Sequence, residues 1–324
     1  MIIDAHAHVL PRDYPDRAGF PRMAAVDGET ARDMFFGAFN YRARDVFFDV
    51  ERRIEAMDAA EIDEEIVSPM PPLLNYTLDI DNGTSLFRHV NETLARYVAE
   101  GAGRIHGLGV IPLQDPDRAA GELQAIADAG LRGAEIGSHV NGVPIGDARF
   151  TAVFQEAERL GLGLFVHTMP RTDEVGVAPA YRGSIGVGIE GTRGAASIAL
   201  GELPATCRLD RLLFSHAAGG LPSILARADY FWAVQPEEAR APERPSEIAR
   251  RFTYDSMVFD PRGLRFVIDY LGADRIVLGT DFPAMARPER LASLLEPLGL
   301  DETDFRAIAS ENARRFLASD ADNV

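Results

Sequence analysis

Five side chains in this sequence have the types and spacing of a metal-binding or acid–base site. His6 and His8 lie two residues apart in the run MIIDAHAH, and residues two apart on a β-strand point to the same face. His167, His216 and Asp281 end the apolar runs GLFVH, RLLFSH and RIVLGTD. An isolated His-x-His pair is more often two hydrogen-bonded structural histidines. The shared position of the other three at strand ends instead favours one common site.

These side chains supply nitrogen and oxygen donors, which suit a divalent cation of borderline softness. We predict that His6, His8, His167 and Asp281 bind one such ion and leave a coordination position for water or substrate. His216 could be a further ligand. A ring beside a metal-bound water also suits proton transfer, however, and we favour that acid–base role.

The composition excludes several other chemistries. Cys207 is the only cysteine, so neither an internal disulfide nor a cysteine-based zinc site is possible. The 33 basic residues are all arginines, which removes Schiff-base catalysis and a carboxylated lysine between two metal ions. A net charge of −17 without a basic block argues against nucleic acid or an anionic membrane as partners.

The overall composition is that of a soluble globular protein. The chain is 46% hydrophobic and 26% charged, and no apolar run approaches the ~20 residues of a membrane span. It begins directly with a strand-like run and shows no signal-peptide pattern, so we expect a cytoplasmic protein.

Eight short apolar runs alternate with helical patterns, as expected for repeated strand–helix units in a parallel sheet. The runs are MIIDAHAH, EEIVSPM, RIHGLGVIP, GAEIGSH, GLFVHT, RLLFSHA, FTYDSMV and RIVLGTDFP. The helical patterns cover residues 49–60, 85–100, 116–129, 147–160, 192–203, 261–271 and 288–295. A count of eight predicts an α/β fold closed into a (β/α)8 TIM barrel, with an open doubly wound sheet as the alternative. In a barrel, the ends of all these strands form the rim that carries active sites.

We treat residues 1–324 as a single barrel domain with two interruptions. Residues 11–48 are too long for an ordinary loop after the first strand and contain DMFFGAFNYRARDVFF, so we expect an insertion that folds over one end of the barrel. Residues 235–251 are rich in Pro, Glu and Arg, and predict an exposed excursion before the seventh strand.

Other polar residues near these motifs are expected to be structural. His89 falls in a helical pattern, and His106 lies at the start of the third strand, which is the stability end of a barrel. His139 ends the fourth strand and could line the pocket, although a loop histidine bound to backbone is the simpler interpretation. Asp4 is expected to orient a neighbour or to hydrogen-bond a loop, and Asp255 either supports a ligand or is only structural.

Longer motifs around these residues make the chain resemble the single-metal branch of the amidohydrolase superfamily, the branch around 2-amino-3-carboxymuconate 6-semialdehyde decarboxylase. The resemblance covers nearly the whole chain and rests on MIIDAHAH, RRIEAMDAAEID, VIPLQDPDRA, GLGLFVHT, FSHAAGGLPSILAR, TYDSMVFDP, RIVLGTDFP and ENARRFL. It implies a distorted (β/α)8 barrel with zinc, or sometimes manganese, on His6, His8, His167 and Asp281. It also implies that His216 is the acid–base histidine. The absence of lysine agrees with this single-metal branch.

The resemblance further implies substrate-binding residues and a homodimer. Decarboxylases of this branch hold substrate carboxylates with one arginine from the insertion and one that is donated across the dimer after the sixth-strand histidine. Arg42 and Arg227 occupy similar places here, with Arg44 as a close alternative to Arg42. The loop after His167 departs from the branch because it has no tryptophan and offers Tyr181 as a substrate contact. The resemblance therefore does not extend to the identity of the substrate.

The leading hypothesis is a metal-dependent decarboxylase of a small unsaturated or aromatic carboxylic acid. The resemblance implies that the ion binds water or a polar group of the substrate, that His216 and Asp281 control the proton delivered to carbon, and that arginines hold the carboxylate. The nearest alternative is a hydrolase or hydratase of the same fold, acting on an ester, lactone, C–C bond or alkene. A binding protein for an anionic metabolite is disfavoured, because a plain carboxylate pocket needs no water-activating ion.

Overall fold

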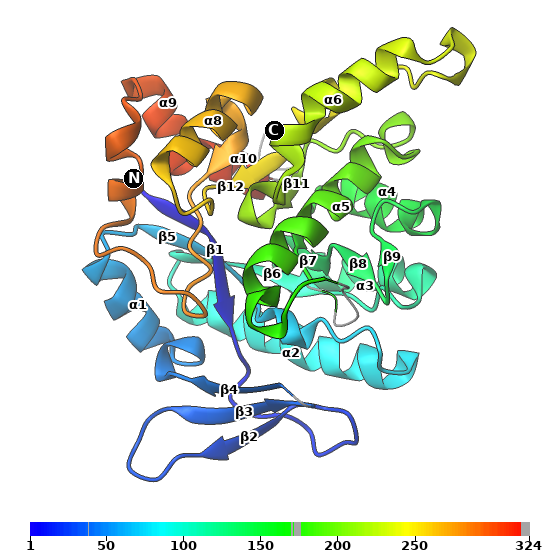
Figure 1. Ribbon diagram of the computed structural model, residues 1–324. Coiled ribbons are helices and arrows are strands. Elements are labelled where there is room, and N and C mark those ends of the chain that lie inside the picture. Colours follow the sequence, from blue (N-terminus) through cyan, green and yellow to red (C-terminus); the bar gives the residue numbers. More distant parts are fainter. Residues whose placement is uncertain (38, 170, 172–175, 319–324) are drawn as a thin grey trace.

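A computed structural model describes residues 1–37, 39–169, 171 and 176–318, and its central feature is a parallel sheet of eight strands that closes into a barrel (Figure 1). In sheet order the strands are β1 (Ile3–Val9), β5 (Glu64–Pro69), β6 (Ile105–Val110), β7 (Gly133–Gly137), β10 (Gly163–His167), β11 (Leu212–Phe214), β12 (Thr253–Asp255) and β13 (Ile276–Val277). The first and last strands meet through backbone hydrogen bonds, since the N–H groups of Thr280 and Asp281 donate to the His6 carbonyl at 3.2 and 2.7 Å. The predicted (β/α)8 TIM barrel is confirmed.

Apolar side chains cover both faces of the strands, as expected when helices surround a closed sheet. A large outer cluster fills the space between strands and helices. Inside the barrel a smaller cluster is closed by the last helix; its members are Ile3, Ala5, Ile66, Leu108, Phe165, Leu213, Val277, Ala313, Phe316 and Leu317. Gly163, the first residue of β10, has no room for a side chain, because an added Cβ would lie 2.6 Å from the Phe316 ring. The amino end of the barrel is therefore filled, and a polar site has room only at the carboxyl end.

Aspartate residues begin many of the surrounding helices. The helices are α1 (Val50–Ala59), α2 (Ile80–Glu100), α3 (Pro116–Asp128), α4 (Thr151–Arg159), α5 (Val187–Ala199), α6 (Leu221–Val234), α7 (Pro245–Ala249), α8 (Pro261–Leu271), α9 (Glu302–Arg306) and α10 (Asn312–Leu317). The carboxylates of Asp49, Asp79, Asp115, Asp260 and Asp301 each accept a backbone N–H from the first turn of a helix. Within the described ranges, no helix has both the length and the apolar character needed to cross a membrane.

Several helix boundaries differ from the predicted ones. α2 begins at Ile80 rather than at residue 85, and α5 begins at Val187 rather than at residue 192. The pattern at residues 288–295 does not form an α-helix but gives the short 3-10 turns Leu291–Leu294 and Glu296–Leu298. Pro297 has no N–H to donate and disfavours helical geometry at the residue before it, so a longer helix cannot propagate there.

The insertion after the first strand forms its own small sheet. Its antiparallel strands are β2 (Arg22–Ala25), β3 (Arg32–Phe36) and β4 (Phe39–Ala43), and they lie beyond the carboxyl end of β1 (Figure 1). The Tyr41 hydroxyl and the Arg44 guanidinium both donate to the Pro283 carbonyl at 3.4 Å. The insertion therefore contacts the rim loop that carries Asp281. A separate two-stranded ribbon, β8 (His139–Val140) and β9 (Val143–Pro144), follows β7.

The second interruption follows α6, which extends away from the barrel (Figure 1). Residues 235–251 form the 3-10 turn Glu237–Ala239 and the short helix α7. Trp232 packs against this segment, because its Nε1–H donates to the carbonyl of residue 241 at 2.8 Å and the Arg244 guanidinium lies 5.5 Å from its ring. Tyr230 and Phe231 stay 64% and 47% exposed.

A buried network of charges joins β5 to α1 and to the loop after β13. Glu65 is fully buried and accepts hydrogen bonds from Arg53 Nη1 at 2.8 Å and from Arg287 Nη1 at 2.6 Å. Arg53 is also fully buried and donates to the carbonyl of His8 at 2.5 Å. Because these groups have no access to water, removing one partner leaves the other charge uncompensated.

We expect Arg53→Ala to lower the free energy of unfolding by about 3–5 kcal/mol, because Glu65 and the His8 carbonyl both lose a buried donor. Urea denaturation followed by circular dichroism measures the loss. Arg262→Ala is the matched control, since the Arg262 side chain is 91% exposed, and its midpoint should equal that of the wild type. A loss in Arg53→Ala no larger than in the control would contradict the role of the network.

Candidate metal centre

The histidines and the aspartate singled out in the sequence meet at the carboxyl end of the barrel. His6 and His8 come from β1, His167 ends β10, His216 follows β11 and Asp281 follows β13. His6 Nε2 lies 3.1 Å from His8 Nε2 and 3.8 Å from Asp281 Oδ1, and His8 Nε2 lies 3.1 Å from the same oxygen. One donor atom from each of His6, His167, His216 and Asp281 lies within 4.8 Å of the others.

Fixed acceptors orient three of the imidazole rings. Nδ1 of His6 donates to Asp255 Oδ2 at 2.6 Å, Nδ1 of His8 donates to the last carbonyl of β5 at 3.0 Å, and Nδ1 of His167 donates to the next carbonyl along the chain at 3.0 Å. Each ring therefore keeps a lone pair on Nε2. Nε2 of His167 is buried without a hydrogen-bond partner. Three unprotonated nitrogens and a carboxylate oxygen around one point are the donor set of a divalent cation, so these residues fit a metal ion.

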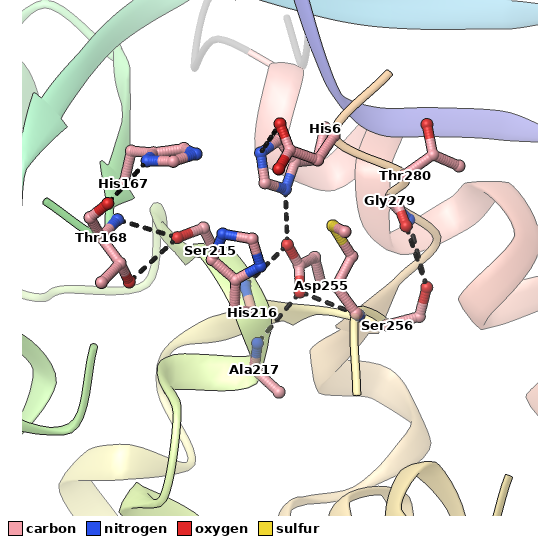
Figure 2. A network of polar contacts seen from close by, with 12 residues as sticks. His6, His167, Thr168, Ser215, His216, Ala217, Asp255, Ser256, Gly279 and Thr280 are labelled. Carbon is pink, nitrogen blue, oxygen red and sulfur yellow. Dashed lines mark hydrogen bonds and ion pairs between the residues drawn. The ribbon is translucent and has the colours of Figure 1, made fainter. Parts of the chain in front are cut away.

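Asp255, at the end of β12, joins His6 to the loop that carries His216 (Figure 2). Its fully buried carboxylate accepts the N–H groups of His216 and Ala217 at 2.9 and 3.0 Å, besides the His6 ring. Gly279 permits this contact, because an added Cβ would lie 2.8 Å from the His6 Cβ and 2.9 Å from the Asp255 Cβ. The sequence left open whether Asp255 supports a ligand or is only structural. Its hydrogen bond to the His6 ring gives it the supporting role.

His216 lies in a turn with left-handed backbone geometry. The φ angles of His216, Ala217 and Ala218 are 52°, 49° and 56°, which side chains other than glycine seldom adopt. Such geometry persists only where neighbours hold it in place. Besides the Asp255 carboxylate, the Ser215 hydroxyl fixes this turn by accepting the Thr168 N–H at 2.9 Å (Figure 2).

Asp281 is placed by the loop that closes the barrel. It also has a positive φ, 57°, and its N–H donates to the His6 carbonyl at 2.7 Å. The preceding Thr280 donates its hydroxyl to Asp4 at 2.5 Å, and Asp4 also accepts the His6 N–H at 3.2 Å. Asp4 thus anchors this loop, as expected. The Asp281 side chain remains 13% exposed, so the centre opens to solvent on this side.

Burial and neighbouring charges set the protonation of the site. Burial lowers the pKa of His8 and His216 and holds the pKa of His167 well below its ordinary value. Burial also opposes charge on His6, but the neighbouring carboxylates outweigh it and raise the pKa of that ring. Burial would raise the pKa of Asp281, yet the hydrogen bond with His8 and the charges of the nearby histidines hold it below the usual range. Asp281 is therefore ionised, and burial favours the neutral form of the His8, His167 and His216 rings.

The arginines of the insertion lie on different sides of it. Arg42 is exposed on β4 and pairs with Asp33 at 2.8 Å and with Glu29 at 3.4 Å, so the structure does not bring it to the histidines. Arg44 follows the end of β4, and its guanidinium lies 5.6 Å from the ring of Phe282, next to Asp281. Arg44 is thus the insertion arginine that approaches the centre.

The other two expected substrate contacts are exposed side chains. Tyr181 lies on the 3-10 turn Pro179–Tyr181 and is 62% exposed. Residues 170 and 172–175 of the same loop lie outside the described residues. Arg227 is exposed on α6, and its guanidinium lies 5.0 Å from the ring of Phe231.

The remaining histidines have structural partners. His89 and His139 make hydrogen bonds to backbone carbonyls at 2.8 and 2.9 Å, and His106 contacts Glu64 at 3.0 Å. These contacts agree with the structural roles expected for all three.

Sequence reasoning did not single out Glu135, a carboxylate next to the centre. It lies on β7, is fully buried, and has a carboxylate oxygen within 4.8 Å of ring nitrogens of His8 and His167. A signal was present, because Glu135 is the single charged residue in the otherwise apolar run GAEIG.

Comparison with known proteins now settles the family. The sequence profile of the amidohydrolase family matches residues 3–318, a span that includes all five residues of the centre. The chain belongs to the amidohydrolase family. The assignment made from the sequence motifs is confirmed.

Several relatives and structural neighbours of this amidohydrolase are named as decarboxylases. The 2-amino-3-carboxymuconate-6-semialdehyde decarboxylase of Dictyostelium discoideum is 27% identical over 330 residues, covering 98% of this chain and 92% of the relative. The structure of 5-carboxyvanillate decarboxylase LigW from Sphingomonas paucimobilis has a TM-score of 0.76 at 25% identity, covering 98% of both chains. A dihydroxybenzoic acid decarboxylase from Polaromonas, solved with manganese and 2-nitroresorcinol, shares the fold with a TM-score of 0.72 at 21% identity, covering 98% of this amidohydrolase and 96% of the neighbour.

We expect Asp255→Asn to weaken binding of a divalent ion roughly 10- to 100-fold, because the amide cannot hold the His6 ring and the His216 turn as the carboxylate does. Chelator competition with Zn²⁺ or Mn²⁺ measures this affinity. Asp260→Asn is the control, since Asp260 caps the exposed start of α8 and lies outside the centre. Equal affinities in the two variants would show that Asp255 is not needed to position the ligands.

Proposed function

We propose that this amidohydrolase is a metal-dependent carboxy-lyase that decarboxylates a small unsaturated or aromatic carboxylic acid. One observation carries the proposal: three imidazole lone pairs and the Asp281 carboxylate surround one point in a barrel whose relatives, matched over almost their full length, are named decarboxylases. A cytoplasmic location, and a small-molecule substrate rather than nucleic acid or a membrane as partner, complete the proposal.

His6, His8, His167 and Asp281 would hold a single divalent ion. Zn²⁺ is the first candidate because imidazole nitrogens suit it, and Mn²⁺, found in the Polaromonas neighbour, is the alternative. Such an ion, when bound, polarises a substrate oxygen and lowers the pKa of a coordinated water.

Decarboxylation breaks the bond between the substrate carbon and its carboxylate, and the electron pair left on that carbon must take up a proton. His216 is placed to control this proton, since its ring lies 5.4 and 5.5 Å from the rings of His6 and His167 and keeps partial exposure. Asp281, ionised and facing the same space, would assist the transfer.

An arginine and a tyrosine are the proposed contacts to the substrate carboxylate. The packing of Arg44 on the loop after Asp281 supports Arg44 over Arg42 for the arginine of the insertion. Tyr181 stays a candidate contact from the loop after β10.

Variants of the centre should separate metal binding from proton transfer. We expect His6→Ala and Asp281→Ala to lose most of the bound metal, because each removes a direct ligand. His216→Ala should retain metal but lower turnover by roughly 10²- to 10⁴-fold, the usual size of a lost acid–base group. Elemental analysis and release of CO₂ from a panel of aromatic and unsaturated acids measure the two properties.

His89→Ala serves as the control in this series, because His89 lies on α2 and its ring is hydrogen-bonded to the Asp13 carbonyl. Equal metal loss in His6→Ala and His216→Ala would make His216 a ligand rather than the acid–base group. Hydrolysis or hydration by the metal-loaded enzyme, without CO₂ from any acid of the panel, would overturn the proposed reaction.

We also propose a homodimer in which α6 of one subunit reaches the site of the other. The exposed side of α6 carries large apolar side chains, Ile224, Tyr230, Phe231 and Val234, which a monomer would leave in water. Arg227 lies on the same helix, where its guanidinium packs on the ring of Phe231. A second copy of the chain is the partner that would cover this surface and place Arg227 beside a substrate carboxylate.

Subunit mixing tests the shared site. Arg227→Ala should raise KM or lower turnover without loss of metal, because it removes a substrate contact only. Arg227→Ala and His216→Ala subunits, each impaired alone, should regain part of the activity once mixed, since one site of each heterodimer then has both groups. A monomer at working concentration by light scattering, or no rescue despite proven exchange of subunits, would rule out the shared site.

A further inference from the structure

Glu135 is a buried carboxylate with no role in the proposed centre, which consists of four predicted ligands and His216. On β7 the side chains of Ala134 and Ile136 pack in the outer cluster, so that of Glu135, between them, points into the barrel. The residue has no solvent exposure, and neither of its oxygens meets the distance and angle of a hydrogen bond in the described part of the chain, although the Ser68 hydroxyl is a polar neighbour. A carboxylate in such a place is strongly destabilising unless a cation or a set of donors compensates it.

The atoms around Glu135 have the spacing of ligands rather than of a hydrogen-bonded pair. One of its oxygens lies within 4.8 Å of ring nitrogens of His8 and His167. Nε2 of His167 likewise has no hydrogen-bond partner, so the carboxylate and this nitrogen lie near each other without a hydrogen bond between them. Protonation would let the Glu135 carboxyl donate to a neighbour such as the Ser68 hydroxyl, but the pairing of Glu135 with Ser68 would leave Nε2 of His167 without a partner. A cation that touches both groups satisfies them together.

We infer that Glu135 is an additional ligand of the divalent ion, next to His8 and His167. This inference rests on the metal centre of the proposed function and extends its donor set to three imidazoles and two carboxylates. A second carboxylate makes the set richer in oxygen, which favours a five- or six-coordinate ion such as Mn²⁺ over four-coordinate Zn²⁺.

The test compares Mn²⁺ binding by the chelator-treated full chain and by Glu135→Gln. Glutamine keeps the size and shape of the side chain but removes its charge, so we expect a roughly tenfold or greater loss of Mn²⁺ affinity by calorimetry. Loss of Zn²⁺ affinity should be smaller. In chelator without metal, Glu135→Gln should melt at the same temperature as the wild type or higher, because the uncompensated carboxyl is gone.

Glu122→Gln is the matched control, since Glu122 is a largely buried carboxylate that pairs with Arg88 on the outer helices. It should bind Mn²⁺ like the wild type. Glu135→Asp is the second variant: it keeps the charge but withdraws the oxygens by one methylene, and it should also bind Mn²⁺ more weakly.

The outcomes separate this inference from the proposed function. Wild-type Mn²⁺ affinity in a folded Glu135→Gln or Glu135→Asp variant would overturn the role of Glu135 and leave the four-ligand centre intact. Failure of the wild type to bind any divalent ion would overturn both the centre and the inference.

Discussion

The backbone bonds between β1 and the loop after β13 are the contact on which the rest of the centre depends. The His6 carbonyl accepts the N–H groups of Thr280 and Asp281, so a single peptide group both closes the barrel and fixes the spacing between the first histidine and the last carboxylate. Asp281 then reaches His8 Nε2 at 3.1 Å from a left-handed backbone position. Closure of the sheet and assembly of the donor set are thus one structural event, which explains why residues 275 positions apart in sequence form a single site.

Hydrogen bonds within the protein, rather than solvent, compensate the polar groups that are buried around the centre. Asp255 compensates the His6 ring and the strained His216 turn, and Arg53 compensates the His8 carbonyl together with Glu65. Each of these contacts lies in a medium of low polarity, where a satisfied hydrogen bond is strong and an unsatisfied group is expensive. The rings are consequently held in one tautomer and one orientation before an ion binds, which is the preorganisation that a metal centre requires.

The apolar interior of the barrel and the segments at its carboxyl rim have different roles. Below the centre, Phe165 packs 4.8 Å from the His6 ring and belongs to the inner cluster that α10 closes. Beyond the carboxyl end of β1 lies the β2–β4 insertion, and α6 projects away from the barrel on the opposite side of the view (Figure 1). Segments of this kind carry specificity in barrel enzymes, because loops at the carboxyl rim can change without disturbing the core. Arg44 and Tyr181 both come from such segments, whereas the histidines come from the ends of strands.

The sequence by itself determined the eight strands, the barrel and the candidate ligands, because strand runs buried on both faces and polar residues at their ends are local patterns. It also determined α8 to the residue, where Asp260 and Pro261 begin the helix and Gly272 ends it. Only the tertiary structure separated Arg44 from Arg42, since β4 ends between them and an ion pair with Asp33 holds Arg42 on the outer side. It also placed Glu135 next to the centre, because barrel closure turns this carboxylate of an apolar strand towards ring nitrogens from two other strands.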